Sequence, residues 1–194
     1  MAEESLLVPL DEYLASGVHI GTKFKTKDMA KFIYKTNPNG LTVLNVQKID
    51  ERLRVAVSFL AKFAPDEILL VCKRENGWKG VEAFSKLTGI KIYKGRYPAG
   101  VLTNMQLETF IEPKLVVVID PWLDKNAVND ALKINIPIMA LCDTNNTLNK
   151  VDLAVPLNNK GAKSIGLAMY VLARDYLKAK GIKAKINKDD FLGA

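Results

Sequence analysis

The feature that most limits the possible folds of this chain is the alternation of short apolar runs with helical patterns. Continuous Val, Ile and Leu runs are typical of strands buried on both faces, as in a parallel sheet. Between the runs, apolar residues return at intervals of three and four, the period of a helix with one buried face. The predicted strands occupy residues 41–46, 67–71, 90–93, 115–119, 138–142 and 153–155. This order predicts βαβ units and therefore an α/β fold around a central parallel sheet.

The alternation spans residues 41–180 and predicts one α/β domain. The last helical pattern ends near Gly181, a residue type that favours helix termination. Residues 1–40 form an N-terminal extension, and residues 181–194 form a C-terminal tail of basic and mixed charge. Because no internal repeat and no linker rich in Pro, Gly or Ser divides the sequence, we expect no further domain.

The charge balance favours a polyanionic partner. The chain holds 28 Lys and Arg against 21 Asp and Glu, a formal net charge of +7 with an isoelectric point near 9.3. Such an excess is typical of nucleic-acid-binding proteins. No apolar stretch approaches the roughly 18 residues of a membrane span, and the acidic N-terminus lacks the basic flank of a signal peptide. We therefore expect a cytoplasmic protein with no membrane partner.

Cysteine and histidine are too few to predict a metal or cofactor site. Cys72 and Cys142 each follow a Val/Ile/Leu-rich run, which predicts two small core residues at strand ends and no disulfide. His19, the only histidine, lies between two glycines. That setting favours a turn residue or an RNA contact over a catalytic base. We expect no metal, no cofactor and no small-molecule substrate.

The segment 151–164, VDLAVPLNNKGAKS, joins a predicted strand to the last predicted helix and resembles a phosphate-binding loop. Asn158 and Asn159 are predicted helix caps, and Lys160, Gly161, Lys163 and Ser164 are predicted in the first turn, where free backbone N–H groups attract anions. A mononucleotide-binding loop needs an adjacent Gly-Lys pair and an upstream glycine, and both are missing here. The anion that remains is a nucleic-acid phosphate; the alternative is a capped helix with solvated lysines.

Two aspartates at strand ends give an alternative from another class of protein. Asp120 and Asp143 directly follow the fourth and fifth predicted strands, where ligands of parallel sheets collect. Together they could hold Mg²⁺ in a small nucleotide- or magnesium-dependent enzyme. Strand-end aspartates also cap ordinary turns, and the Asp-Pro and Asp-Thr-Asn sequences here are typical turn sequences. We therefore favour a protein without catalytic residues.

Basic residues beside aromatic or glycine residues recur in three distant segments: the N-terminal extension and the turns after the second and third predicted strands. This mixture suits an RNA surface on which lysines neutralise phosphates and arginine or aromatic planes stack on exposed bases. The alternative is a solvated lysine face. The candidate RNA-binding residues are Lys23, Lys25, Lys27, Lys31, Lys73, Arg74, Arg96, Lys160 and Lys163.

A series of ordered motifs resembles the ribosomal protein S2 family of the small ribosomal subunit. The motifs lie at residues 17–22 (GVHIGT), 39–40 (NG), 96–104 (RYPAGVLTN), 112–113 (EP), 120–121 (DP), 135–137 (NIP), 142–144 (CDT) and 158–164 (NNKGAKS). The resemblance implies a flavodoxin-like three-layer sandwich with helices on both faces of the sheet and no enzymatic activity. It further implies binding to small-subunit rRNA and to neighbouring ribosomal proteins between head and body, in assembly and translation.

Two departures indicate the archaeal branch of that family. Bacterial members insert a coiled-coil hairpin after the Leu-Thr-Asn motif, but here only residues 105–112 separate that motif from Pro113. The chain also lacks the long acidic C-terminal extension of eukaryotic members. Contacts made by either missing part are not expected here.

Overall fold

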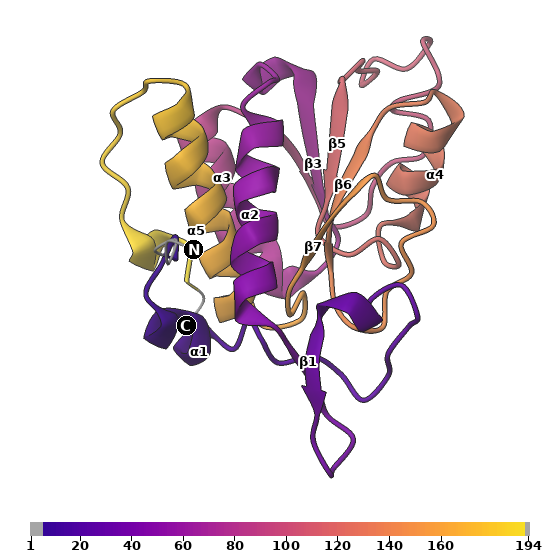
Figure 1. Cartoon of the computed structure of the whole chain (residues 1–194). Helices are drawn as coiled ribbons and strands as arrows, with labels where there is room; N and C mark the ends of the chain where they lie inside the picture. Colours follow the sequence, from indigo (N-terminus) through magenta and orange to yellow (C-terminus); the bar gives the residue numbers. More distant parts are fainter. Residues whose placement is uncertain (1–5, 193–194) are drawn as a thin grey trace.

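The structure, a computed structural model, describes residues 6–192 and holds a five-stranded sheet, a small hairpin and flanking helices (Figure 1). The five strands are β3 (Ile68–Cys72), β4 (Lys91–Lys94), β5 (Leu115–Val118), β6 (Ile138–Cys142) and β7 (Leu153–Pro156). The hairpin strands are β1 (Ile33–Thr36) and β2 (Thr42–Leu44). The α-helices are α1 (Leu10–Ser16), α2 (Val46–Leu60), α3 (Trp78–Thr88), α4 (Lys125–Lys133) and α5 (Ala162–Ala179). Short 3₁₀ turns are η1 (Ala30–Phe32), η2 (Pro65–Glu67), η3 (Glu75–Gly77) and η4 (Lys188–Asp190).

All neighbouring strands of the main sheet are parallel, in the order β4-β3-β5-β6-β7. When these five strands are renumbered 1 to 5 in chain order, their order across the sheet is 2-1-3-4-5, as in flavodoxin-like folds. The order reverses between β3 and β5, which makes that pair the topological switch point of the sheet. The predicted α/β fold with a parallel sheet is confirmed.

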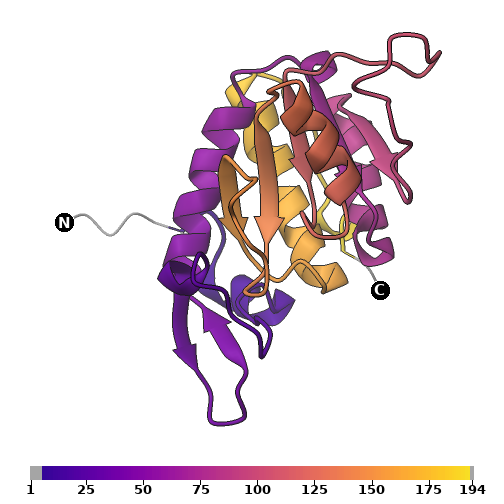
Figure 2. The same ribbon diagram turned by 90° about the vertical axis from the view of Figure 1, so that its right-hand side faces the viewer.

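Helices cover both faces of the sheet, as predicted. Helix α5 packs against both α2 and α3 over one face, and α4 packs on β5 over the other (Figures 1 and 2). Every residue of β3, β5, β6 and β7 is buried, which explains the absence of polar alternation in those runs. Cys72 and Cys142 are free and buried at the ends of β3 and β6, as the sequence predicts.

The first predicted strand does not join the parallel sheet, so that part of the prediction is wrong. Only Thr42–Leu44 is extended, and it pairs antiparallel with β1 in the separate hairpin. The next residue, Asn45, ends the strand because its side chain accepts a hydrogen bond from the Gln47 N–H at 2.9 Å and caps α2. The hairpin projects from the body in both views (Figures 1 and 2).

Both segments outside the alternation contribute to the core. In the N-terminal extension, Tyr13, Val18 and Met29 are buried. In the C-terminal tail, Phe191 is buried against α5, where its ring lies 5.8 Å from that of Tyr170, centroid to centroid. Within the described residues 6–192, no helix is both long and apolar enough to cross a membrane.

Candidate nucleic-acid interface

The carboxyl ends of the five parallel strands form one edge of the sheet, and most of the basic candidates follow these ends. Arg96 follows β4, Lys73 and Arg74 follow β3, and Lys160 lies four residues beyond β7. Because neighbouring strands lie about 4.8 Å apart, the edge is about 20 Å wide. The fold therefore gathers residues from distant parts of the sequence along one rim, which we call the carboxyl edge.

The N-terminal extension lies against the same edge. The N–H of Thr22 donates to the side-chain oxygen of Thr144 at 2.9 Å, and that hydroxyl donates to the Phe24 carbonyl at 2.9 Å. The Thr26 hydroxyl donates to the Asn146 carbonyl at 2.7 Å. These bonds hold the extension to the loop that follows β6. They place its three exposed lysines at the end of the molecule that carries the strand-end basic residues: Lys23, Lys25 and Lys27.

Close packing fixes the position of the N-terminal extension where it passes the loop that follows β6. A Cβ atom added at Gly21 would lie 2.5 Å from the Thr144 methyl carbon and 2.8 Å from the Thr42 hydroxyl. Only glycine fits between these threonines without displacing one of them. Part of the GVHIGT motif is therefore a packing motif.

Beneath the rim, one buried amide joins three strand ends. The Asn146 side chain donates to the Asp120 carboxylate at 3.1 Å. Its oxygen accepts from the Asp143 N–H at 2.7 Å and from the Asn159 side chain at 3.1 Å. All four residues are buried. Their hydrogen bonds fix the loops after β5, β6 and β7 relative to one another.

An ion pair occupies the topological switch point. The Arg74 guanidinium lies 2.6 Å from the Asp120 carboxylate, and their side chains are 21% and 5% exposed. Beside it, Asp124 accepts hydrogen bonds from the N–H groups of Lys73 at 3.0 Å and Asp120 at 3.3 Å. Burial raises the pKa of Asp124 to about 7, although both backbone hydrogen bonds oppose the shift. The crevice where flavodoxin-like folds bind ligands is thus filled by the chain's own charges.

Asp143 has a basic partner too. Its carboxylate lies 3.4 Å from the Lys160 ammonium, and it accepts from the Thr144 N–H at 2.6 Å. Burial raises the pKa of Asp143, and the Thr144 N–H and the Lys160 charge oppose this shift. The two strand-end aspartates are therefore both engaged by neighbouring basic side chains.

These partners weaken the enzyme alternative. Neither Asp120 nor Asp143 is free to form a shared ligand set, because each is held by other residues. The described part of the chain holds no group of three His, Cys, Asp or Glu side chains placed to bind a metal ion.

The start of α5 differs from the sequence prediction. Helix α5 begins at Ala162 with Gly161 as its N-cap residue and no side-chain cap. Asn158 instead caps the turn before the helix, accepting from the N–H groups of Lys160 at 3.0 Å and Gly161 at 3.2 Å. Asn159 is buried in the amide network, so its predicted role as a helix cap is wrong. Lys163 is exposed in the first turn, as expected, but Lys160 and Gly161 precede the helix, so their predicted place in its first turn is wrong.

The candidate basic residues now fall into three groups. Arg74 and Lys160 have internal acidic partners. Lys31 lies in η1, away from the strand ends; its backbone carbonyl accepts from the Lys48 ammonium, and its own ammonium lies 5.1 Å from the Phe32 ring centroid. The remaining candidates are exposed at or beside the carboxyl edge: Lys23, Lys25, Lys27, Lys73, Arg96 and Lys163.

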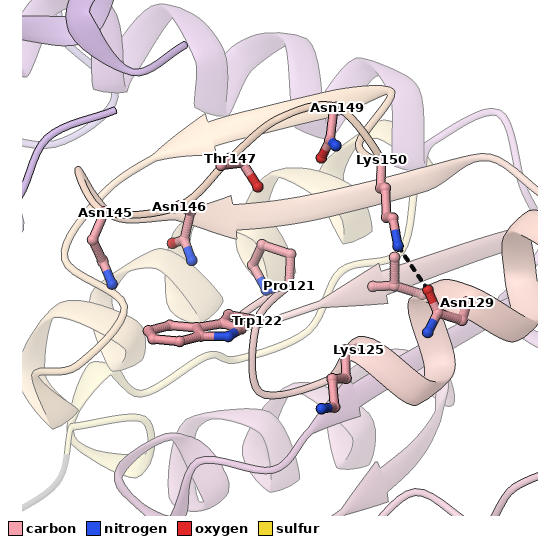
Figure 3. A pocket seen from close by; sticks show the side chains of 10 residues that line it. Pro121, Trp122, Lys125, Asn129, Asn145, Asn146, Thr147, Asn149 and Lys150 are labelled. Carbon is pink, nitrogen blue, oxygen red and sulfur yellow. Dashed lines mark hydrogen bonds between the residues drawn. The ribbon is translucent and has the colours of Figure 1, made fainter. Parts of the chain in front are cut away.

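Sequence reasoning missed a cavity of about 410 Å³ at the same end of the sheet. It lies between the start of α4 and the loop joining β6 to β7 (Figure 3). Trp122, Lys125 and Lys150 contribute to its lining. The available signal was an aromatic residue between Pro121 and a basic helix start, which resembles many turn sequences.

Comparison with known proteins assigns the chain to a family. Residues 13–112 and 108–179 match the family described as Ribosomal protein S2. The small ribosomal subunit protein uS2 of Nanoarchaeum equitans is 45% identical over 186 residues, which cover 96% of this chain and 91% of that protein. Proteins of the same name from two strains of Methanococcus maripaludis are 43% and 44% identical over 195 residues, covering 99% of this chain and 89% of each.

The place where the two family matches meet agrees with the archaeal features of the sequence. They overlap at residues 108–112, inside the short connection that replaces the bacterial hairpin. The three relatives named above are archaeal. With matches extending from residue 13 to residue 179 and near-full-length archaeal relatives, the chain belongs to the ribosomal protein S2 family.

Proposed function

We propose that this chain is a structural constituent of the small ribosomal subunit in the cytoplasm, where it binds small-subunit rRNA and adjacent ribosomal proteins between head and body. Membership of a ribosomal protein family implies a structural, non-enzymatic role. The names of the archaeal relatives support the subunit.

One observation supports the RNA surface in particular. The carboxyl edge carries acids and bases in its sequence, yet its two strand-end acids are paired inside the fold. Asp28 and Glu75 are exposed in the same segments, but the exposed basic residues outnumber them, so the exposed charge at the rim is mainly basic: Lys23, Lys25, Lys27, Lys73, Arg96 and Lys163. A rigid rim of lysines recognises the shape and backbone of folded RNA, because phosphate contacts position a protein without selecting a base sequence.

The candidate residues contribute unequally to phosphate binding. Six exposed residues at or beside the carboxyl edge contact phosphates directly: Lys23, Lys25, Lys27, Lys73, Arg96 and Lys163. Lys31 contacts a phosphate from its separate position in η1. Arg74 and Lys160 contribute less, since each shares its charge with a buried aspartate.

Salt dependence of rRNA binding tests this surface. Each phosphate contact adds roughly 0.7 to 0.9 to the log–log slope of affinity against salt. Replacing Lys23, Lys25 and Lys27 by alanine should therefore lower the slope by about 2.1 to 2.7. The matched control removes the same charge from exposed lysines outside the carboxyl edge: Lys62, Lys86 and Lys91. Equal slopes for the two triple variants would remove the N-terminal extension from the interface.

Sedimentation of cell extract tests the assignment to the subunit. The full chain should migrate with the small subunit and leave it only in strong salt. Migration as a free protein in low salt would contradict the proposed function.

A further inference from the structure

The cavity beside Trp122 is lined by an aromatic ring, amide side chains and two lysines, and none of the nine candidate RNA-binding residues lines it. It is formed by the turn after β5, the first turns of α4 and the β6–β7 loop. Its volume of about 410 Å³ lies within the usual range for small-ligand sites. We call it the Trp122 pocket.

The indole of Trp122 is an exposed flat surface held in a fixed turn. The side chain is 70% exposed, although tryptophan is among the residues that gain most from burial. The backbone at Trp122 is held in place, because the Trp122 N–H donates to the buried Asp120 carboxylate at 3.0 Å. Pro121, the residue before Trp122, has a φ angle fixed by its ring. An exposed aromatic ring on a rigid turn is a suitable platform for a stacked base.

A side-chain amide, that of Asn145, lines the same space. The side-chain oxygen of Asn145 is shielded from solvent and accepts no hydrogen bond from any described residue. Figure 3 shows this side chain directed toward the indole. In Figure 3 the end of the amide nearest the indole is its nitrogen, which is a hydrogen-bond donor, so the arrangement suits a ligand that brings an acceptor. The ring nitrogens on a base edge are such acceptors.

Two lysines give the pocket its charge. Lys125 begins α4, and the Lys150 ammonium donates to the Asn129 side chain at 3.0 Å on the side opposite the indole (Figure 3). The nearest acids of the adjoining turn are buried and paired: Asp120 with Arg74, and Asp124 with two backbone N–H groups. The pocket therefore attracts anions.

We propose that the Trp122 pocket holds one unpaired nucleotide of an RNA strand, with its base stacked on Trp122, its base edge at Asn145 and its flanking phosphates at Lys125 and Lys150. The inference rests on the proposed function in taking RNA as the partner. The aromatic ring matches the face of a base, the amide matches the base edge, and the two separated cations match the phosphates of the backbone. An acidic peptide offers nothing for the indole to stack on.

Binding of labelled hexaadenylate to the full chain tests the pocket. Stacking on an aromatic residue is worth roughly 5- to 150-fold in affinity, and Trp122→Ala should lose this factor. In the parent protein the RNA should quench tryptophan fluorescence. Trp122→Phe should abolish the quenching while keeping part of the affinity, because phenylalanine also stacks and Trp78 is half-buried.

The charge contribution has its own control. Replacing Lys125 and Lys150 by alanine should lower the salt slope for hexaadenylate by up to about 1.4, the value for two phosphates of a single strand. Replacing Lys62 and Lys86, which are exposed and do not line the pocket, should leave the slope unchanged. Equal effects of the two pairs would contradict a specific site.

Three results would overturn the inference. Hexaglutamate competing as well as hexaadenylate would indicate an acidic-peptide site, and adenosine monophosphate binding as tightly as hexaadenylate would indicate a free-nucleotide site. Hexaadenylate affinity within twofold of the parent in Trp122→Ala would exclude stacking. If any of these results came with rRNA binding that still depended on the N-terminal lysines, only the pocket assignment would fail and the proposed function would stand. Absence of rRNA binding by the parent protein would refute the proposed function itself.

Discussion

The ion pair at the switch point should be structural, and Asp120→Asn tests this. The substitution removes the charge facing Arg74 but keeps an oxygen that can accept from the Trp122 N–H and the Asn146 side chain. Breaking a buried pair by removing one partner costs about 3–5 kcal/mol. The Arg74 side chain is 21% exposed and can recover some hydration, so we expect a loss of about 2–4 kcal/mol in unfolding free energy.

Urea unfolding followed by circular dichroism measures this loss. The control is Glu82→Gln, which breaks an ion pair with Lys94 of similar length, 2.7 Å, between side chains that are 37% and 54% exposed. An exposed pair of this kind contributes at most about 1 kcal/mol. If the two variants lose equal stability, the switch-point pair is an ordinary surface contact and the reasoning fails.

The same variant also tests how Arg74 is used. Removing the Asp120 charge frees the guanidinium for a phosphate, so the slope of rRNA affinity against salt should steepen by roughly 0.7 to 0.9. A loss of stability without a steeper slope would show that Arg74 lies out of reach of the RNA.

Three further predictions concern packing, pH and thiol chemistry. Gly21→Ala should lower unfolding free energy by about 1–3 kcal/mol through the clash with Thr144, whereas Gly161→Ala, whose nearest neighbour would lie 3.4 Å away, should cost less; thermal unfolding compares the two. Because burial raises the pKa of Asp124 to about 7 and the unfolded value is about 3.9, the folded chain binds this proton more tightly, so stability from this group is greatest below pH 4 and falls as pH rises to about 7. Asp124→Asn should remove up to about 4 kcal/mol of that pH dependence in urea titrations, and parallel curves for the two proteins would contradict it. Burial raises the pKa of the Cys72 thiol to about 12, so iodoacetamide at neutral pH should label it only after unfolding; rapid labelling of the native chain would show that β3 opens.

The sequence predicted buried elements well because their signal is local. The runs at residues 115–119 and 138–142 differ from β5 and β6 by at most one residue, since a strand buried on both faces has to be apolar throughout. The run at residues 41–46 contains the same residue types. This run, however, pairs with β1 because of a nearby turn and the cap at Asn45, and a search for apolar periodicity detects neither feature.

The site was less predictable because its contacts join distant residues. Arg74 and Asp120 lie 46 positions apart, and Thr22 and Thr144 lie 122 apart. Composition showed that the chain is basic, yet nothing in the spacing showed which basic residues have internal acidic partners. The Trp122 pocket depends in the same way on where the β6–β7 loop lies over α4.

Under the proposed function, the arrangement of charge at the carboxyl edge accounts for the binding of a folded polyanion by an α/β sheet of this order. In flavodoxin-like folds the switch-point crevice accepts a small ligand, and acids at the strand ends commonly take part. Here the Arg74 guanidinium fills that crevice, and Asp120 and Asp143 are used to fix the loops that carry the lysines. A phosphate chain approaching the sheet therefore meets basic side chains on a rim whose positions are set from beneath. Removing one of these acids should consequently alter RNA binding in two opposed ways, by freeing a cation and by loosening the loop that positions its neighbours.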